Sequence, residues 1–216
     1  MDTTATVEAL VGLGILLTAL YLQSESFVDP LVSGIAVQSL LLAALLGWLA
    51  WVYDNWEFGA VAVLVVGVRV LLVPYILRRQ TRAFRWRARE IHASHRVTGH
   101  ALAAVALAIV GWFVFQQTLA PSLPAVPGIA LPFVLLLEGL LMLATRRNTL
   151  VQVIGYLEEE NAIVYAAALF AFGFPLFIEV VVFLDVLGVV LVAIILSIQR
   201  DVTGLPEAEI LEELSG

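Results

Sequence analysis

The sequence predicts an all-α fold, a polytopic bundle of about seven transmembrane helices. Of its 216 residues, 62% are hydrophobic and 13% are charged, and the mean hydropathy is +1.01. Soluble globular chains contain about 45–50% apolar and about 25% charged residues. The composition is therefore typical of an integral membrane protein.

Seven apolar stretches are long enough to cross a membrane, because a helix needs about 20 residues to span roughly 30 Å of hydrocarbon. Short segments rich in turn residues separate them, such as SESFVDP, YDNWE and FGFP. The predicted spans are residues 7–23, 30–53, 58–77, 97–118, 127–145, 149–170 and 174–198. We expect the first stretch to be retained as a span, because no basic segment of a signal peptide precedes it.

The spans predict one membrane domain over residues 1–216, with no internal repeat. Within it we distinguish a four-helix part at 7–118, a three-helix part at 127–198 and an acidic tail at 201–216.

The arginines predict the orientation of this domain. All eleven basic residues are arginine, and basic residues concentrate in cytoplasmic loops. Seven follow the third span, two follow the fifth and one follows the seventh, and these segments share a side if there are seven spans. The exception, Arg69, lies within the third span. We therefore expect the N-terminus outside and the C-terminus in the cytoplasm, in a multi-pass protein of the inner (plasma) membrane.

The segment RRQTRAFRWRAREIHASHR, residues 78–96, predicts an amphipathic helix at the membrane interface. One interpretation is a dock for a soluble partner subunit. The other, which we favour, is contact with lipid headgroups that also fixes the topology. We expect no nucleic-acid partner, because the adjacent membrane already explains the charge. The residues expected to make these contacts are Arg78, Arg79, Arg82, Arg85, Arg87 and Arg89.

Four predicted spans place an ionisable residue at a similar depth. At 1.5 Å per helical residue, Glu160 lies about 20 Å and Asp185 about 22 Å from the nearest cytoplasmic arginine. The same count gives about 14 Å for Arg69 and about 12 Å for Glu138. Intramembrane charges are rare, costly and usually functional, so we favour a lateral polar chain over a structural Glu138–Arg69 clamp. Glu179 lies nearer the outer end of its helix, where it can reach the headgroups.

No cofactor or metal site is predicted. The absence of cysteine excludes disulfides, thiolate-bound iron–sulfur clusters and cysteine nucleophiles. His92, His95 and His100 lie close together in the sequence, but no carboxylate or cysteine completes a ligand set. Without a catalytic motif or a phosphate-binding loop, we expect the chain itself to be non-catalytic.

Residues 145–196, TRRNTLVQVIGYLEEENAIVYAAALFAFGFPLFIEVVVFLDVLGVVLVAIIL, resemble the last three helices of the hydrogenase-4 membrane component E. That region is similar in turn to the K subunit of respiratory complex I and the C subunit of multisubunit cation/proton antiporters. The stretch VRVLLVPYIL at 68–77 resembles the family's third helix, which has a basic residue in the place of Arg69. The matching positions downstream are Arg147, Asn148, Gly155, Tyr156, Glu160, Asn161, Glu179 and Asp185.

The resemblance implies a membrane subunit of an energy-converting, hydrogenase-like complex that moves protons or cations. Other membrane subunits would be its partners, together with a soluble electron-transfer arm on the cytoplasmic side. Two alternatives stay open: a subunit of a cation/proton antiporter without a redox partner, and a scaffold for larger ion-translocating subunits. The residues expected in the proton or ion relay are Glu160, Asp185, Glu138, Glu158, Arg69, Asn161 and Glu179.

Three consecutive glutamates occupy the centre of the sixth predicted span. Successive helical residues are 100° apart, so Glu158, Glu159 and Glu160 cover about 200° of the helix and cannot all face one neighbour. We assign the relay to Glu160, which matches the position in component E. Glu158 lies next to Leu157, where the K subunit has its acid, and we expect an intermediate role for it.

Overall fold

The computed structural model describes residues 3–83, 94–122 and 128–170, with Val181, Asp185, Gly188 and Val190 further on. In this part of the chain the structure is helical and contains no strand element, which confirms the all-α class. Four positions of the predicted seventh span are described, and all four are helical. Glu179, the acidic tail and residues 84–93 of the predicted interfacial helix lie outside the described residues.

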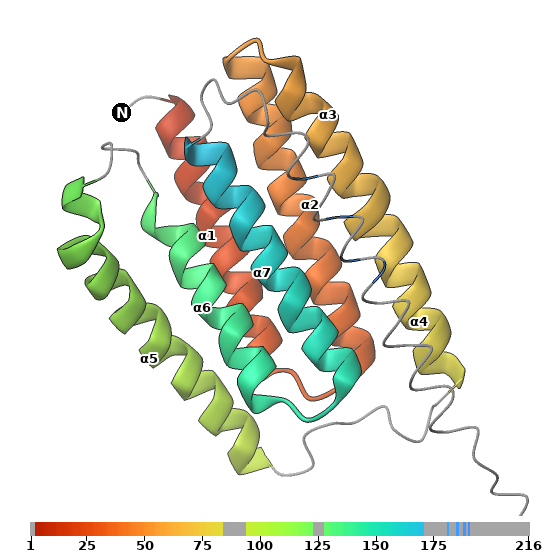
Figure 1. Cartoon of the computed structure of the whole chain (residues 1–216). Coiled ribbons are helices and arrows are strands. Elements are labelled where there is room, and N and C mark those ends of the chain that lie inside the picture. The colour runs from red at the N-terminus through yellow and green to blue at the C-terminus, as the bar shows by residue number, and fades with distance from the viewer. Residues whose placement is uncertain are drawn as a thin grey trace, which may run out of the picture.

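The first two helices form an antiparallel pair. Helix α1 covers Thr3–Ser24 and α2 covers Val28–Val52, and they run side by side in Figure 1. Glu25 closes the turn between them, because its Oε1 accepts hydrogen bonds from the backbone N–H groups of Ser26 and Phe27 at 2.7 and 3.0 Å. Pro30 occupies the first turn of α2, where a missing N–H costs nothing.

The third predicted span is one helical rod with a wide turn in the middle. It comprises α3 (Trp56–Val65), a π-helix η1 (Val66–Leu72) and α4 (Val73–Ala83). Asn55 caps its start, with its side chain accepting a hydrogen bond from the N–H of Glu57. In the π-helix the N–H of Val73 bonds to the carbonyl of Val68, five residues back. Pro74 follows directly, and proline cannot continue the α-helical ladder.

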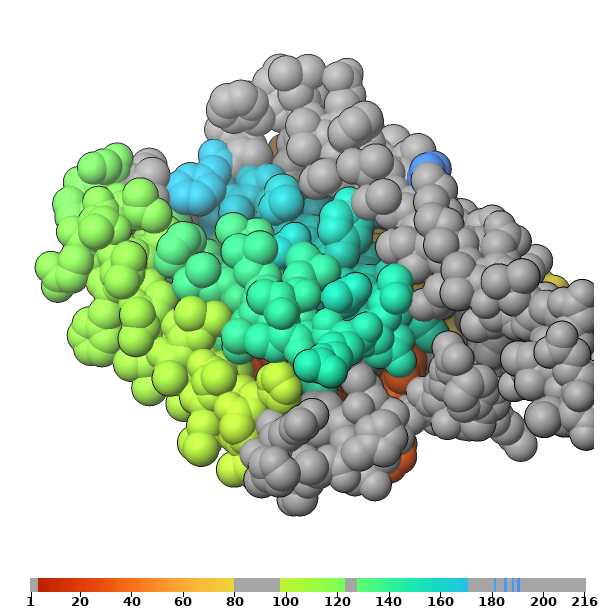
Figure 2. Space-filling view, turned by 60° about the horizontal axis from the view of Figure 1, so that its bottom comes forward, coloured from red at the N-terminus to blue at the C-terminus, as the bar shows by residue number. Residues whose placement is uncertain are grey.

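The remaining named elements are α5 (Ser94–Thr118), a short 3-10 helix η3 (Ala120–Ser122), α6 (Ala130–Thr145) and α7 (Thr149–Phe170). Helix α7 lies centrally in Figure 1, beside α6 and α2, whereas α5 lies at the edge of the bundle. Figure 2 shows α5 flanking α6 on the surface.

Four segments in the described part are long and apolar enough to cross a membrane: Thr4–Ser24, Val28–Val52, Trp56–Arg79 and Thr98–Ser122. Helix α6 has 16 residues, and α7 carries the three glutamates. The structure thus supports a membrane protein, while the count of seven spans and the orientation stay predictions.

Helices α6 and α7 approach closely at two glycines. A Cβ atom on Gly139 would lie 2.9 Å from the carbonyl oxygen of Gly155, and one on Gly155 would lie 3.1 Å from that of Gly139. Small residues permit such close backbone approach between membrane helices. The crossing places Glu138 on α6 opposite the glutamate run on α7.

Arg146 ties this helix pair to α1. Its side chain is buried, and Nη2 donates hydrogen bonds to the carbonyls of Gln23 and Leu22 at 2.7 and 3.3 Å. A cation is favourable at the C-terminal end of a helix, where carbonyls lack partners. Gln23 in turn donates from Nε2 to the carbonyl of Glu138 at 2.7 Å. In the sequence, Arg146 was only a marker of orientation, whereas in the structure it also links the end of α6 to the end of α1.

Candidate functional site

Arg69 is the centre of a buried polar network. The side chain is 2% exposed. Its Nε donates to Oδ1 of Asp185 at 2.6 Å, and its Nη1 donates to Oδ1 of Asn161 at 2.9 Å. Nη2 lies 3.5 Å from Oε2 of Glu160. The structure thus brings together four of the residues that the sequence assigned to the relay.

The π-helix positions this arginine. Arg69 stands fourth in Val66–Leu72 and is the buried residue of that segment. A π-turn changes which way the following side chains point, and such turns occur often at functional sites. Arg69 reaches α7 and the helical position of Asp185 from this wide turn.

Asn161 connects the arginine to α2. Its amide nitrogen Nδ2 donates to Oε1 of Gln38 and to Oγ of Ser39, both at 3.0 Å. Its oxygen Oδ1 accepts from Arg69 and, at 3.3 Å, from the Ser39 hydroxyl. Asn161 therefore uses both ends of its amide inside the bundle, with no exposed surface.

Gln38 extends the network to Glu158. Its Nε2 donates to Oε1 of Glu158 at 3.4 Å, and both side chains are fully buried. Glu138 follows, close enough to Glu158 for the two carboxyl groups to repel each other when charged. Both carboxyl oxygens of Glu138 are buried and make no hydrogen bond among the described residues. The result is a row of polar groups from Asp185 through Arg69, Asn161, Gln38 and Glu158 to Glu138.

The three consecutive glutamates face three different neighbours. Glu160 faces Arg69, and Glu158 faces Gln38 on α2. Glu159 packs on α6, where a Cβ on Gly139 would lie 2.7 Å from its Cγ. This separation is what the 100° step of a helix requires.

The surroundings of Glu160 leave room for its carboxyl group. Tyr156, one turn earlier on α7, is hydrogen-bonded to it. A Cβ on Gly188 would lie 2.7 Å from Oε1 of Glu160, so a larger residue at 188 would displace the carboxyl group. Oε1 itself has no hydrogen-bond partner among the described residues.

The charges of the row do not balance. One guanidinium, from Arg69, faces the carboxyl groups of Asp185 and Glu160, and Glu158 and Glu138 lie beyond. An unpaired buried charge is expensive, so the four carboxyl groups cannot all be charged at low cost. The row therefore contains groups able to hold protons, with alternative positions for them.

Sequence analysis missed the residues that join these acids. Gln38 and Ser39 are absent from the predicted site, although Gln38 bridges Asn161 and Glu158 and Ser39 is hydrogen-bonded to Asn161. Two adjacent polar residues in the middle of an apolar span were the available signal. Within the described chain, the partners of Arg69 are Asp185, Asn161 and Glu160. The structure therefore does not show the alternative clamp between Arg69 and Glu138.

The basic residues of the predicted interfacial helix are described only in part. Arg78 and Arg79 are exposed at the end of the third span. The side chains of Arg82, Arg85, Arg87 and Arg89 lie outside the described residues, as do His92 and His95. Within the described chain, no three His, Asp or Glu residues are grouped as metal ligands.

Fold and site together define a helical, membrane-spanning type of protein with a charged network inside its bundle. No family model matches the chain, and no solved structure matches it. It is similar to a protein of Mycobacterium tuberculosis described as "Uncharacterized protein Rv0085", with 28% identity over 161 residues, 72% of this chain and 71% of the relative. That description names no activity.

Proposed function

We propose that this protein is a non-catalytic membrane subunit of an energy-converting complex related to hydrogenase-4 and complex I. In that complex its buried acids contribute to the translocation of protons or cations. The observation that carries the proposal is the buried row from Asp185 through Arg69 to Glu138. Intramembrane ionisable residues that face a bundle interior commonly mark proton relays.

The row runs across the bundle rather than along it. Glu138, Glu158, Gln38 and Arg69 each lie near the middle of α6, α7, α2 and the α3–α4 rod, respectively. A mid-depth row links neighbouring subunits more directly than it links the two sides of the membrane. Entry and exit of the ion are therefore assigned to partner subunits.

Two alternatives predict different partners. An antiporter subunit would share the buried row but work without a redox arm. A scaffold would use Arg69 and Asp185, 2.6 Å apart, only to hold helices together. Purification of the complex from native membranes and identification of its subunits distinguishes the proposed function from the antiporter alternative. Nickel–iron hydrogenase subunits would support the proposal, and antiporter subunits alone would support the antiporter alternative.

Proton uptake by membrane vesicles tests the role of the row itself. Glu160→Gln removes a carboxyl group that contacts Arg69, and we expect it to remove most of the uptake while the complex assembles. Glu159→Gln is the matched control, because Glu159 lies outside the row, and uptake should stay near normal. Uptake is normalised to assembled subunit. Normal uptake with Glu160→Gln and loss with Glu158→Gln would show that the relay acid is Glu158.

The proposed orientation has its own test, helped by a sequence without cysteine. Ser94 begins α5 and Ser122 ends η3, at opposite ends of an apolar helix. Single cysteines at these positions should react with impermeant thiol reagents from opposite sides, with Ser122→Cys labelled from outside. Labelling of both from outside would contradict the seven-span topology.

A further inference from the structure

Helix α7 leaves one stripe of its surface uncovered. The residues of this stripe follow a repeating spacing of four and three positions, so they lie along one side of the helix. All of them are half-buried or exposed, and Figure 2 shows atoms of α7 on the surface beside α6. Such spacing is typical of the seam along which two helices pack. The outer stripe of α7, as we name it, consists of Gln152, Tyr156, Glu159, Ile163, Ala166 and Phe170.

Lipid would readily cover an apolar stripe, but half of this one is polar. Nε2 of Gln152 donates to the carbonyl of Arg146 at 2.9 Å, and Tyr156 is hydrogen-bonded to Glu160. Glu159 differs, because its Oε1 is buried and has no hydrogen-bond partner among the described residues. The stripe therefore contains a carboxyl group that the described part of the chain does not satisfy.

Glu159 lies too deep to reach water at either end of α7. It is the eleventh of the 22 residues of this helix, so each end is about 15 Å away. That distance is well beyond the reach of a glutamate side chain. An unpaired carboxylate in hydrocarbon is expensive, and intramembrane acids almost always pair with another group or face a wet cavity.

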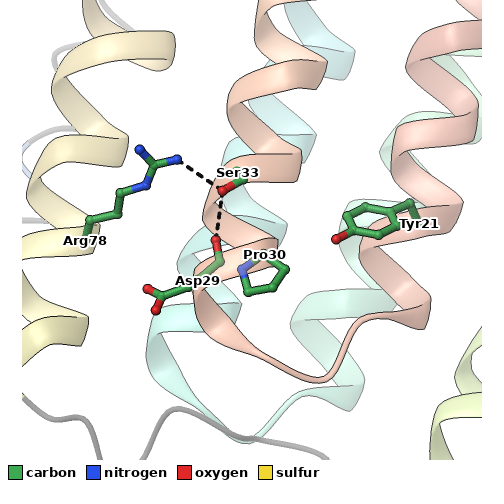
Figure 3. A pocket seen from close by; sticks show the side chains of 5 residues that line it. All are labelled: Tyr21, Asp29, Pro30, Ser33 and Arg78. Atoms are coloured by element: carbon green, nitrogen blue, oxygen red, sulfur yellow. Dashed lines mark hydrogen bonds between the residues drawn. The ribbon is translucent and has the colours of Figure 1, made fainter.

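Polar groups at the end of the bundle are in a different position. Beside a hollow of about 490 Å³ where α2 begins (Figure 3), Nη2 of Arg78 donates to Oγ of Ser33, and that hydroxyl donates to the carbonyl of Asp29, both at 3.1 Å. Arg78 also lies next to the last residue of the apolar segment Trp56–Arg79, where water and headgroups are within reach. Glu159 has neither a partner within the described chain nor a nearby membrane boundary.

This chain has no spare cation at the depth of Glu159. Its basic residues are all arginine, and Arg69 alone lies within a predicted span. Arg69 already contacts two carboxyl groups and one amide of the buried row. The predicted span at 174–198 contains no arginine or lysine, and a second copy of the chain would bring only another Glu159 to a symmetric contact. A cation for Glu159 therefore has to come from a different protein.

We propose that the outer stripe of α7 binds a transmembrane helix of another subunit, and that this helix carries an arginine or lysine paired with Glu159. Toward Phe170 the partner helix packs on apolar residues, and the small Ala166 permits close approach. The pair with Glu159 sets the depth of the partner helix, because neither charge is stable alone in hydrocarbon. This contact rests on the proposed function in one respect, that the chain is a subunit of a membrane complex.

Photo-crosslinking in native membranes tests which molecule covers the stripe. The photoreactive residue p-benzoylphenylalanine replaces Ile163, four positions from Glu159, in the full chain within its complex. The matched control is the same replacement of Ile109 on α5, since the two isoleucines are exposed to a similar extent, at 40% and 53%. The probe at Ile163 should attach to an apolar segment of another subunit, with an arginine or lysine about one helical turn from the attachment site, and the probe at Ile109 should not attach to that segment. Attachment to lipid alone, or to a segment without a basic residue, would overturn the proposal.

Neutralising Glu159 measures the strength of the contact. Glu159→Gln should reduce recovery of the partner subunit with the tagged chain at least tenfold, as expected when one member of a buried charged pair is removed. Glu57→Gln, the same change at the start of α3, should leave recovery unchanged. Replacing the partner's basic residue with methionine should cost as much as Glu159→Gln, and combining the two changes should cost no more than either alone. Equal losses from Glu159→Gln and Glu57→Gln would contradict a specific pair.

A role of Glu159 within its own chain has a separate readout. Glu159→Gln should not lower the thermal stability of the purified chain, because the partner is absent there, and a loss of stability would overturn the contact. Unchanged recovery of the partner with Glu159→Gln would also overturn the contact, while leaving the relay through Glu160 intact. Normal uptake per assembled subunit with Glu160→Gln would count against that relay and leave the contact of Glu159 intact.

Discussion

Helices α7 and α5 are similar in length but have opposite surroundings. Over its 22 residues, α7 buries Glu158, Glu160 and Asn161. Over its 25 residues, α5 exposes large apolar side chains, with Leu102 at 66% and Phe113 at 63%. A soluble protein keeps charged residues outside, whereas lipid readily covers an apolar face. In this bundle, polar residues within an apolar stretch indicate the inner helix.

The largest expected effect comes from removing the charge at the centre of the inner network. Arg69→Gln leaves Asp185 and Glu160 without their guanidinium, and breaking a buried pair in this way costs about 3–5 kcal/mol. Thermal unfolding of the purified chain in detergent would measure the loss. Arg79→Gln is the control, because Arg79 is exposed. Recovery of stability in Arg69→Gln/Asp185→Asn would localise the cost in the pair, and unchanged stability of Arg69→Gln would contradict the pairing.

A smaller effect on the free energy of unfolding, with opposite signs on the two helices, is expected when alanine replaces a glycine. Gly155→Ala on α7 places a Cβ about 3 Å from Gly139, Met142 and Leu143, and such overpacking costs about 1–3 kcal/mol. Gly99→Ala on α5 meets no atom within 4 Å and should stabilise the helix by about 0.5–1 kcal/mol. The same thermal unfolding measures both. Equal shifts for the two variants would contradict the close crossing of α6 and α7.

The smallest effect on stability is expected from a substitution on the outer face of α5. Leu102→Ala changes an exposed side chain, so its effect on the free energy of unfolding should stay within about 0.5 kcal/mol. Destabilisation of the assembled complex beyond 1 kcal/mol would mean that a partner subunit, rather than lipid, covers this face.

The sequence predicted helix positions well because apolar length and turn residues carry that information. The predicted span at 149–170 coincides with α7, and the span at 30–53 differs from α2 by one or two residues. The π-helix at Val66–Leu72 was not predicted, although Pro74 was a local sign of an irregular ladder. Hydropathy records how far a helix extends but not how its turns are wound.

The proximity of Arg69, Glu160 and Asp185 could be predicted from the sequence, because the rise per residue determines how deep each residue lies along its helix. The direction of each side chain could not, since it depends on how neighbouring helices pack. Depth alone therefore predicted Glu138 and Glu160 equally well as neighbours of Arg69. Only the packing shows Glu138 at the far end of the row, and Gln38 as the link to Glu158.

The contact between Arg146 and the end of α1 has a consequence for biogenesis. The two carbonyls that Arg146 caps belong to residues 123 and 124 positions earlier in the chain. At about 5–20 residues per second, synthesis takes on the order of ten seconds to cover that interval. Until Arg146 arrives, α1 and α2 are in the membrane without this cap. Nascent chains arrested before residue 146 should therefore contain an α1 whose last turn exchanges its amide protons faster than in the completed protein.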